Sequence, residues 1–256
     1  MSYTLLEVSI DGPVARVTLN NVRRRNALSF EMLSELQEAL REVSASDATG
    51  MVLGAHGSVF SSGHDFADLA ARDAVGVAHL LELCTDVMLT MHSMPQVVIG
   101  RIQGLATGGG CQLAASTDLA VAGRSAGFQL PGGKGGWFCH TPSVPVARAV
   151  GRKRLMEMAL TGDIIDAETA LSWGLVNRVV DDDALDEAVD ELLARATRGS
   201  AASKAWGKRT LYAQLDRPER DAYSIACESM TAAAQTPGAR EGITAFVEKR
   251  HPVWSD

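Results

Sequence analysis

The hydrophobic and polar positions at the start of the chain predict two strands followed by a helix. The strands cover residues 4–10 and 14–20, on either side of the turn Asp11-Gly12-Pro13. Ser29 stands where a helix cap is needed, and the helix is expected to reach about residue 43. Its apolar positions at helical spacing are Met32, Leu33, Leu36 and Leu40.

A unit of strand, glycine-containing turn and helix then occurs twice. In the first copy, the apolar strand 51–54 leads through a loop into a helix that begins near Asp65. In the second copy, the strand 97–100 leads into a helix that begins near Cys111. This repetition predicts an α/β fold, in which each helix start offers unpaired backbone N–H groups to negative charge. The alternative is that both segments are ordinary tight turns.

From Gly151 onward the pattern is mostly helical. The predicted helices cover residues 152–160, 166–173, 185–198, 203–215, 219–234 and 240–249, with one strand over 175–180. Apolar residues in the last three helices are more frequent than a solvated appendage needs, as at Leu211, Ile225, Ile243 and Phe246. We therefore expect this tail to contact the core or another subunit.

Composition narrows the possible partners. The 256 residues are 46% hydrophobic and carry a net charge of −7 without a basic block, which argues against a nucleic-acid partner. The short run Arg23-Arg24-Arg25 is either a solvated turn or a phosphate contact. The most apolar stretch, 79–94, contains two acidic residues and is shorter than the ~18 residues that a membrane span needs, so no span is expected. The four cysteines match no metal or disulfide pattern, and no secretory signal is seen, which together predict a cytoplasmic location.

Two motifs carry the most specific information, SSGHDF at 61–66 and GGGCQLAASTDLAVAG at 108–123. Through them the chain resembles the enoyl-CoA hydratase/isomerase family, also called crotonases. The resemblance extends over nearly the whole chain, through RRNALS at 24–29, VGRKRLMEMALTGDIIDAETALSWGLVNRVV at 150–180 and EGITAFVEKRHPVW at 241–254. The segment WFCHTP and the PVW ending are similar to a divergent branch, the enoyl-CoA hydratase domain-containing type.

The resemblance implies a fold and an assembly. The expected fold is α/β, a crotonase-like spiral of ββα units over residues 1–200 followed by a C-terminal helical oligomerisation region over 201–256. The family usually assembles as trimers or as hexamers built from two trimers. It implies an acyl-CoA thioester as the ligand, with coenzyme A as part of the substrate and no separate cofactor or metal.

The resemblance also implies how the chemistry is done. A thioester that is attacked at its β-carbon or loses an α-proton develops negative charge on its oxygen, and two backbone N–H groups stabilise that charge. Here the two donors are expected to be the N–H groups of His64 and Gly109. Typical hydratases of the family also use two glutamates, and the matching positions are Gln112 and Gly132, so both usual acid/base groups are absent.

Two histidines are candidates to replace the missing groups. His140 is either a base at the acyl end or a hydrogen-bonded structural residue. His64 either titrates near neutral pH or acts through its backbone alone. The resemblance further assigns contacts with coenzyme A to Arg24, Ala27, Ser62, Gly63, Asp65, Phe66, Phe246 and Lys249, although Asp65 is also suited to cap the next helix.

Three functions remain open from these observations. The first is an acyl-CoA enzyme of the hydratase/isomerase type, whose hydration activity is weak because both glutamates are replaced. The second is a non-catalytic acyl-CoA binder on the same fold. The third is a different crotonase reaction, such as thioester hydrolysis. The fold supports all three, so turnover of acyl-CoAs is the observation that separates them.

Overall fold

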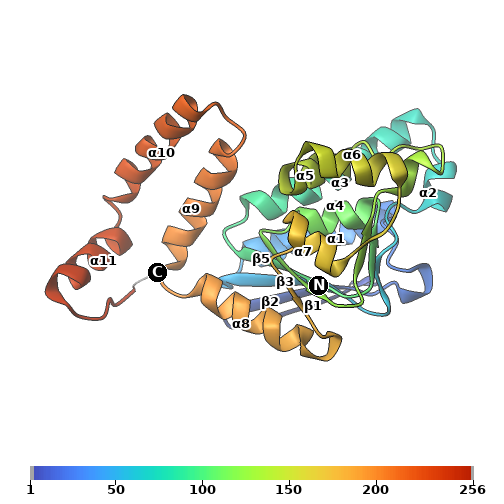
Figure 1. The fold of residues 1–256 in the computed structure, drawn as a ribbon. Helices are drawn as coiled ribbons and strands as arrows, with labels where there is room; N and C mark the ends of the chain where they lie inside the picture. The colour runs from blue at the N-terminus through green and yellow to red at the C-terminus, as the bar shows by residue number, and fades with distance from the viewer. Residues whose placement is uncertain (1–2, 255–256) are drawn as a thin grey trace.

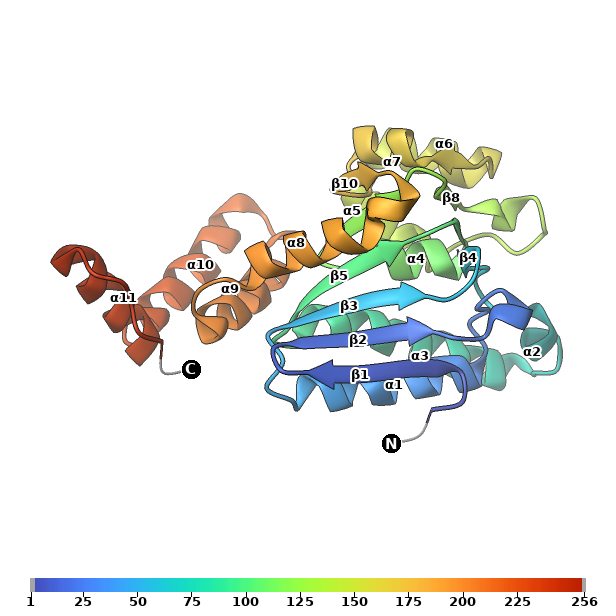
Figure 2. The ribbon, with the colours of Figure 1, turned by 90° about the horizontal axis from the view of Figure 1, so that it is seen from below.

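The computed structural model describes residues 3–254 and is built around a six-stranded sheet. Its strands in spatial order are β1 (Leu6–Asp11), β2 (Val14–Leu19), β3 (Gly50–Ala55), β5 (Val97–Ile102), β7 (Leu119–Gly123) and β10 (Arg178–Val180). The β1–β2 pair is antiparallel and every other pair is parallel. Figure 2 shows β1, β2, β3 and β5 side by side.

A second, four-stranded sheet is made of very short strands that the hydrophobic pattern does not predict. They are β4 (Val59–Ser61), β6 (Leu105–Thr107), β8 (Gly127–Gln129) and β9 (Ile165–Asp166). The first three pair in parallel, and each follows a strand of the large sheet. The repeated unit is therefore strand–strand–helix, and the two segments expected to be loops each contain a strand.

Helices cover both faces of the large sheet. Those of the core are α1 (Phe30–Ser44), α2 (Phe66–Ala70), α3 (Ala74–Ser93), α4 (Gly109–Ala115), α5 (Ser143–Val150), α6 (Arg152–Thr161), α7 (Ala167–Trp173) and α8 (Leu185–Thr197). Because side chains alternate along a strand, Met51 and Leu53 of β3 join the main core with α1, whereas Val52 between them packs with α8. Helix α5 was not predicted. Pro145 lies in its first turn, where a missing N–H costs no hydrogen bond.

Helix α3 is longer than the apolar stretch suggested. It has 20 residues and is, within residues 3–254, the one helix that is long and apolar enough to be compared with a membrane span. Its buried stripe belongs to the hydrophobic core and lies against α1. The stripe consists of Leu80, Cys84, Val87, Met88 and Met91.

The tail consists of α9 (Ala201–Gln214), α10 (Glu219–Ala233) and α11 (Pro237–Glu248). It extends away from the core, with α9 next to the core and α10 and α11 beyond it (Figure 1). Lys208 of α9 anchors it, since its Nζ lies 2.7 Å from Asp118 Oδ2 and donates to the carbonyl of Gln96 at 2.7 Å. Both side chains of this ion pair are largely buried.

Candidate active site

The short strands β4 and β6 bring two turns together. Because the strands are parallel neighbours, their C-terminal ends lie at the same edge of the small sheet. Gly63, in the turn after β4, has φ +80°, and a Cβ there would stand 2.7 Å from the carbonyl oxygen of Thr107 and 2.9 Å from the nitrogen of Gly109. The turns thus touch backbone to backbone, which requires glycine.

Two backbone donors at these turns are free. Within residues 3–254, neither the N–H of His64 nor that of Gly109 donates a hydrogen bond, whereas their neighbours Gly63, Asp65 and Gly108 all do. A Cβ on Gly109 would lie 3.2 Å from the imidazole of His64, so the two residues are adjacent. Two adjacent, unused donors are the elements of an oxyanion hole.

The loop that leads into β4, and β4 itself, are held by a buried asparagine. The Asn26 side chain donates to the carbonyls of His56 and Val59, at 2.9 Å each, and its oxygen accepts from the N–H of Asn21 at 2.9 Å. Its backbone lies in the left-handed region, with φ 52°. The Ser61 hydroxyl donates to the carbonyl of Asn26 at 2.8 Å, which joins this residue to the strand that precedes His64.

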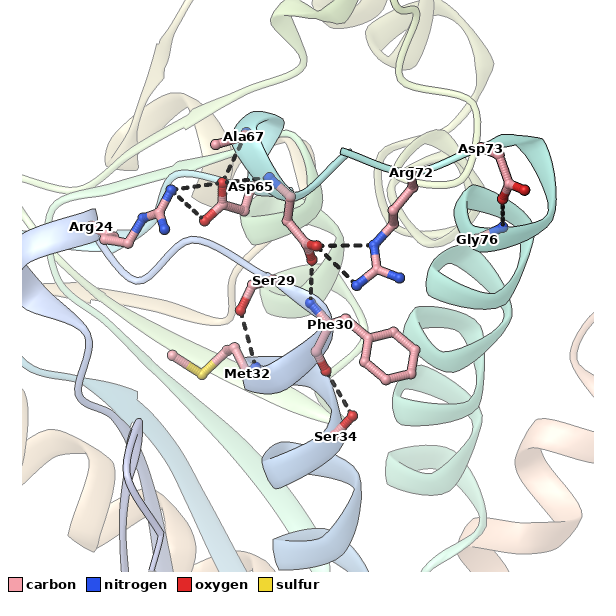
Figure 3. Close-up of polar contacts among 11 residues, drawn as sticks. Arg24, Ser29, Phe30, Met32, Ser34, Asp65, Ala67, Arg72, Asp73 and Gly76 are labelled. Atoms are coloured by element: carbon pink, nitrogen blue, oxygen red, sulfur yellow. Dashed lines mark hydrogen bonds and ion pairs between the residues drawn. The ribbon is translucent and has the colours of Figure 1, made fainter. Parts of the chain in front are cut away.

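Asp65 fixes the turn after β4 (Figure 3). Its carboxylate caps α2 by accepting from the N–H groups of Ala67 at 3.0 Å and Asp68 at 3.2 Å. Nη2 of Arg24 lies 3.0 Å from both carboxylate oxygens. Arg24 and Asp65, both assigned to coenzyme A by resemblance, therefore bind each other, and Asp65 is confirmed as a helix cap.

Beside the two donors lies a cavity of about 130 Å³. It brings together the predicted residues Ser62, Gly63, His64, Phe66, Gly109, Gly132 and His140. The other lining residues are Leu81, Thr107, Gly108, Pro131, Trp137, Phe138, Cys139, Thr141 and Pro142. Leu81 comes from α3, and no motif in the sequence indicated it. The lining is mostly apolar, which suits a hydrocarbon group next to a reacting carbonyl.

The His64 imidazole is not poised to titrate near neutral pH. Burial lowers its pKa to about 4, and its Nε2 is buried without a hydrogen-bond partner among the described residues. Its ring packs edge-on against Trp137, with 5.7 Å between the ring centroids. The alternative in which His64 titrates near pH 7 is therefore wrong, and the ring is neutral at that pH.

The two positions that the resemblance matches to the family glutamates, Gln112 and Gly132, differ in their surroundings. Gln112 is buried on α4, does not line the cavity, and its Oε1 has no partner among the described residues. Gly132 does line the cavity, but a Cβ there would collide with the carbonyl of Trp137 and stand 2.8 Å from the Cys139 nitrogen and sulfur. The chain path leaves no room for a side chain at Gly132.

Three other predicted contact residues lie outside the cavity. Ala27 is buried in the core. Phe246 and Lys249 lie on and just after α11, at the far end of the tail from α2 in both views of the ribbon (Figures 1 and 2). Phe246 is 85% exposed. Within a single chain, Phe246 and Lys249 therefore lie far from the cavity.

The enoyl-CoA hydratase/isomerase family model matches residues 9–256. The chain belongs to this family. Among similar proteins, enoyl-CoA hydratase domain-containing protein 3 of mouse is 39% identical over 246 residues, which cover 94% of this chain and 81% of the mouse protein. A probable enoyl-CoA hydratase, EchA12, of Mycobacterium tuberculosis is 32% identical over 260 residues, 95% of this chain and 90% of that protein.

Solved structures agree with the family fold. A Mycobacterium smegmatis enoyl-CoA hydratase superposes with a TM-score of 0.95 at 39% identity, over 99% of this chain and all of that one. The human enoyl-CoA hydratase domain-containing protein 3 gives 0.94 at 37% identity, over 98% of this chain and 100% of the human chain. The predicted crotonase fold, and the similarity to the domain-containing branch, are confirmed.

The predicted cytoplasmic location is corrected by these comparisons. The similar proteins of mouse, rat and human are each named as mitochondrial. The prediction rested on the lack of a metal or disulfide pattern among the cysteines and on the lack of a secretory signal, and the structure leaves all four cysteines free. Free thiols indicate a reducing environment but do not identify the compartment, so the cysteines could not distinguish one reducing compartment from another.

Proposed function

We propose that the chain binds an acyl-CoA thioester and stabilises negative charge on its carbonyl oxygen with the N–H groups of His64 and Gly109. The observation that carries the proposal is that the N–H groups of these two adjacent residues donate to nothing among the described residues, and that both residues line a mostly apolar cavity. One such donor is worth ~10²–10³ in rate in other enzymes. The acyl group would occupy the cavity, and no separate cofactor or metal would be needed.

The reaction itself is proposed to be of the hydratase/isomerase type, with slow hydration. Gln112 does not titrate, Gly132 has no side chain, and among the described residues no carboxylate lines the cavity to position water and move its proton. His140 is the exposed histidine of the cavity lining, which makes it the candidate base. Binding without turnover, and thioester hydrolysis, are the alternatives.

One experiment separates these functions. Purified protein is incubated with a panel of acyl-CoAs and enoyl-CoAs, products are identified by mass, and binding is followed by calorimetric titration. A hydrated or double-bond-shifted product supports the proposal, free coenzyme A indicates hydrolysis, and binding with no product indicates a binder. Absence of binding at millimolar ligand would contradict all three.

We also propose that the chain forms a trimer or a hexamer through its tail. The tail helices expose large apolar side chains that a solvated appendage would not carry. The most exposed are Leu211, Tyr223, Met230, Ile243, Phe246 and Val247. In such an assembly Phe246 and Lys249 could reach the coenzyme A of a neighbouring subunit. Light scattering that gives a stable 27.1 kDa particle would contradict this.

A further inference from the structure

We propose that the ligand's acyl group is short and uncharged, about four to six carbons, and that Trp137 sets this limit by closing the cavity. The inference rests on the proposed acyl-CoA function and adds the class of acyl chain to it. It begins from the size of the cavity, which is about 130 Å³. An apolar cavity of about 150 Å³ accommodates benzene, a group of six carbons.

The composition of the cavity wall explains why one side chain limits the length of the acyl chain. Residues 132–136 are four glycines and Lys134, and of these Gly132 lines the cavity, while Lys134 Nζ pairs with Asp163 Oδ1 at 2.6 Å. Trp137 is therefore the first large side chain of this loop. Its N–H donates to the carbonyl of Gly132 at 3.0 Å, which fixes the residue at the end of the loop.

The Trp137 ring spans from this loop to the turn that carries the oxyanion donor. It packs edge-on against His64, at 5.7 Å between centroids, and against Phe66, at 6.2 Å. Phe66 is 64% exposed and Trp137 is 39% exposed, so the aromatic pair lies between the cavity and solvent. Removing the indole would open the cavity outward at the point where a longer chain would need to leave.

The chemistry of the lining excludes a charged acyl group. Among the described residues, no carboxylate, ammonium or guanidinium side chain lines the cavity. The polar side chains there are those of two histidines, one serine, two threonines and one cysteine. A terminal carboxylate on the acyl group would lose its hydration without gaining a cationic partner, which is costly.

The test is calorimetric titration with saturated acyl-CoAs from two to twelve carbons, with thioester integrity checked by mass. In the wild type, affinity should rise from acetyl- to hexanoyl-CoA, by about fourfold for each buried methylene, and then stop rising. Succinyl-CoA should bind at least tenfold more weakly than butyryl-CoA, which has the same chain length. The inference would be overturned if affinity kept rising up to dodecanoyl-CoA, or if succinyl-CoA and butyryl-CoA bound with equal affinity.

Two variants should move the limit in opposite directions. Trp137→Ala should extend the rise in affinity to octanoyl- and decanoyl-CoA. Leu81→Trp, which adds a larger side chain to the cavity lining, should end the rise at butyryl-CoA. Trp173→Ala is the matched control, because this tryptophan lies on α7 outside the cavity, and its profile should equal that of the wild type. Identical profiles for all four proteins would overturn the inference alone, whereas no binding by any thioester would overturn the proposed function with it.

Discussion

The N–H of Trp137 donates to the carbonyl of Gly132 at 3.0 Å, and the carbonyl of Trp137 occupies the space where a side chain on Gly132 would begin. The position that the resemblance matches to a second glutamate therefore has no room for a side chain. A carboxylate cannot be restored at Gly132 by substitution alone, because the loop through Trp137 would first have to move.

We expect Gly132→Ala to lower the free energy of unfolding by about 1–3 kcal/mol, as other overpacked sites do. The matched control is Gly135→Ala in the same loop, where the Cβ would meet nothing closer than 3.7 Å and the backbone has no positive φ. That variant should stay within about 0.5 kcal/mol of the wild type. Denaturant unfolding measures the stability of both variants. Equal stability would show that the loop through Trp137 can move to accommodate a side chain at Gly132 without a measurable cost in free energy.

The cap at Asp65 gives a second prediction. Asp65→Ala removes the cap of α2 and the partner of Arg24, whereas Asp73→Ala removes only the cap of α3, an acceptor for the N–H of Gly76 at 2.8 Å (Figure 3). Each should cost about 0.5–2 kcal/mol of stability. Only Asp65→Ala should also weaken acyl-CoA binding, by tenfold or more, because Asp65 adjoins the donor at His64. Equal affinities in the two variants would mean that the cap does not position the donor.

The long elements were predictable from the sequence because their patterns are local. Helix α1 begins at Phe30 with Ser29 accepting from the N–H of Met32, as predicted, and α8 differs from its prediction by one residue. The strands β4, β6 and β8 were missed because each has three residues. Such strands are held by parallel pairing with segments that lie far away in the sequence, which no local pattern reveals.

The grouping of the candidate site was predictable in part for the same reason. His64 and Gly109 were chosen as donors from a motif resemblance, and the two residues are adjacent in the structure, whereas their role as donors stays a prediction. The pairing of Arg24 with Asp65 joins residues 41 positions apart, so each was assigned to the ligand separately. The low pKa of His64 also depends on burial by the fold, and its sequence neighbours alone suggested an ordinary histidine.

The buried His64 predicts a specific loss of stability in acid. The pKa of His64 in the folded state is about 4, below its ordinary value of 6.5, so the unfolded chain binds a proton more readily between these values. The contribution of His64 to the free energy of unfolding is therefore fully present above pH 6.5 and is lost as the pH falls toward 4. We expect a loss of about 2–3 kcal/mol from this residue between pH 7.5 and 4.5.

Denaturant unfolding at the two pH values measures this loss. In His64→Gln the free energy of unfolding should differ less between pH 7.5 and pH 4.5 than it does in the wild type, by that same amount. The control His79→Gln changes an exposed histidine on α3 and should leave the difference unchanged. Equal pH dependence in wild type and His64→Gln would contradict the burial of a neutral imidazole.

The anchor of the tail gives a further prediction. Asp118 accepts from Lys208, from the Tyr212 hydroxyl at 2.8 Å and from the N–H of Val98 at 2.7 Å. Lys208→Met would leave this carboxylate buried without its cation, which typically costs 3–5 kcal/mol. Arg209→Met, at the adjacent exposed position, should change the free energy of unfolding by less than about 0.5 kcal/mol. Similar unfolding midpoints for the two variants would show that the pair does not hold α9.

The last prediction concerns catalytic rate. Hydration of crotonyl-CoA should be ~10²–10⁴-fold slower than in family members that keep both glutamates, since that is the usual worth of positioned acid/base groups. The free donors at His64 and Gly109 should still give a rate above that of the uncatalysed reaction.

If His140 supplies the remaining proton transfer, His140→Ala should lower kcat at least tenfold with little change in KM. His79→Ala should leave both constants unchanged, because that residue is exposed on α3 and is not part of the cavity. Gln112→Glu should raise the rate little, because the side chain lies outside the cavity lining. Two results would contradict this prediction: rapid hydration of crotonyl-CoA by the wild type, or a hundredfold rise in hydration rate in Gln112→Glu. Either result would show that water reaches α4 by a route outside this cavity.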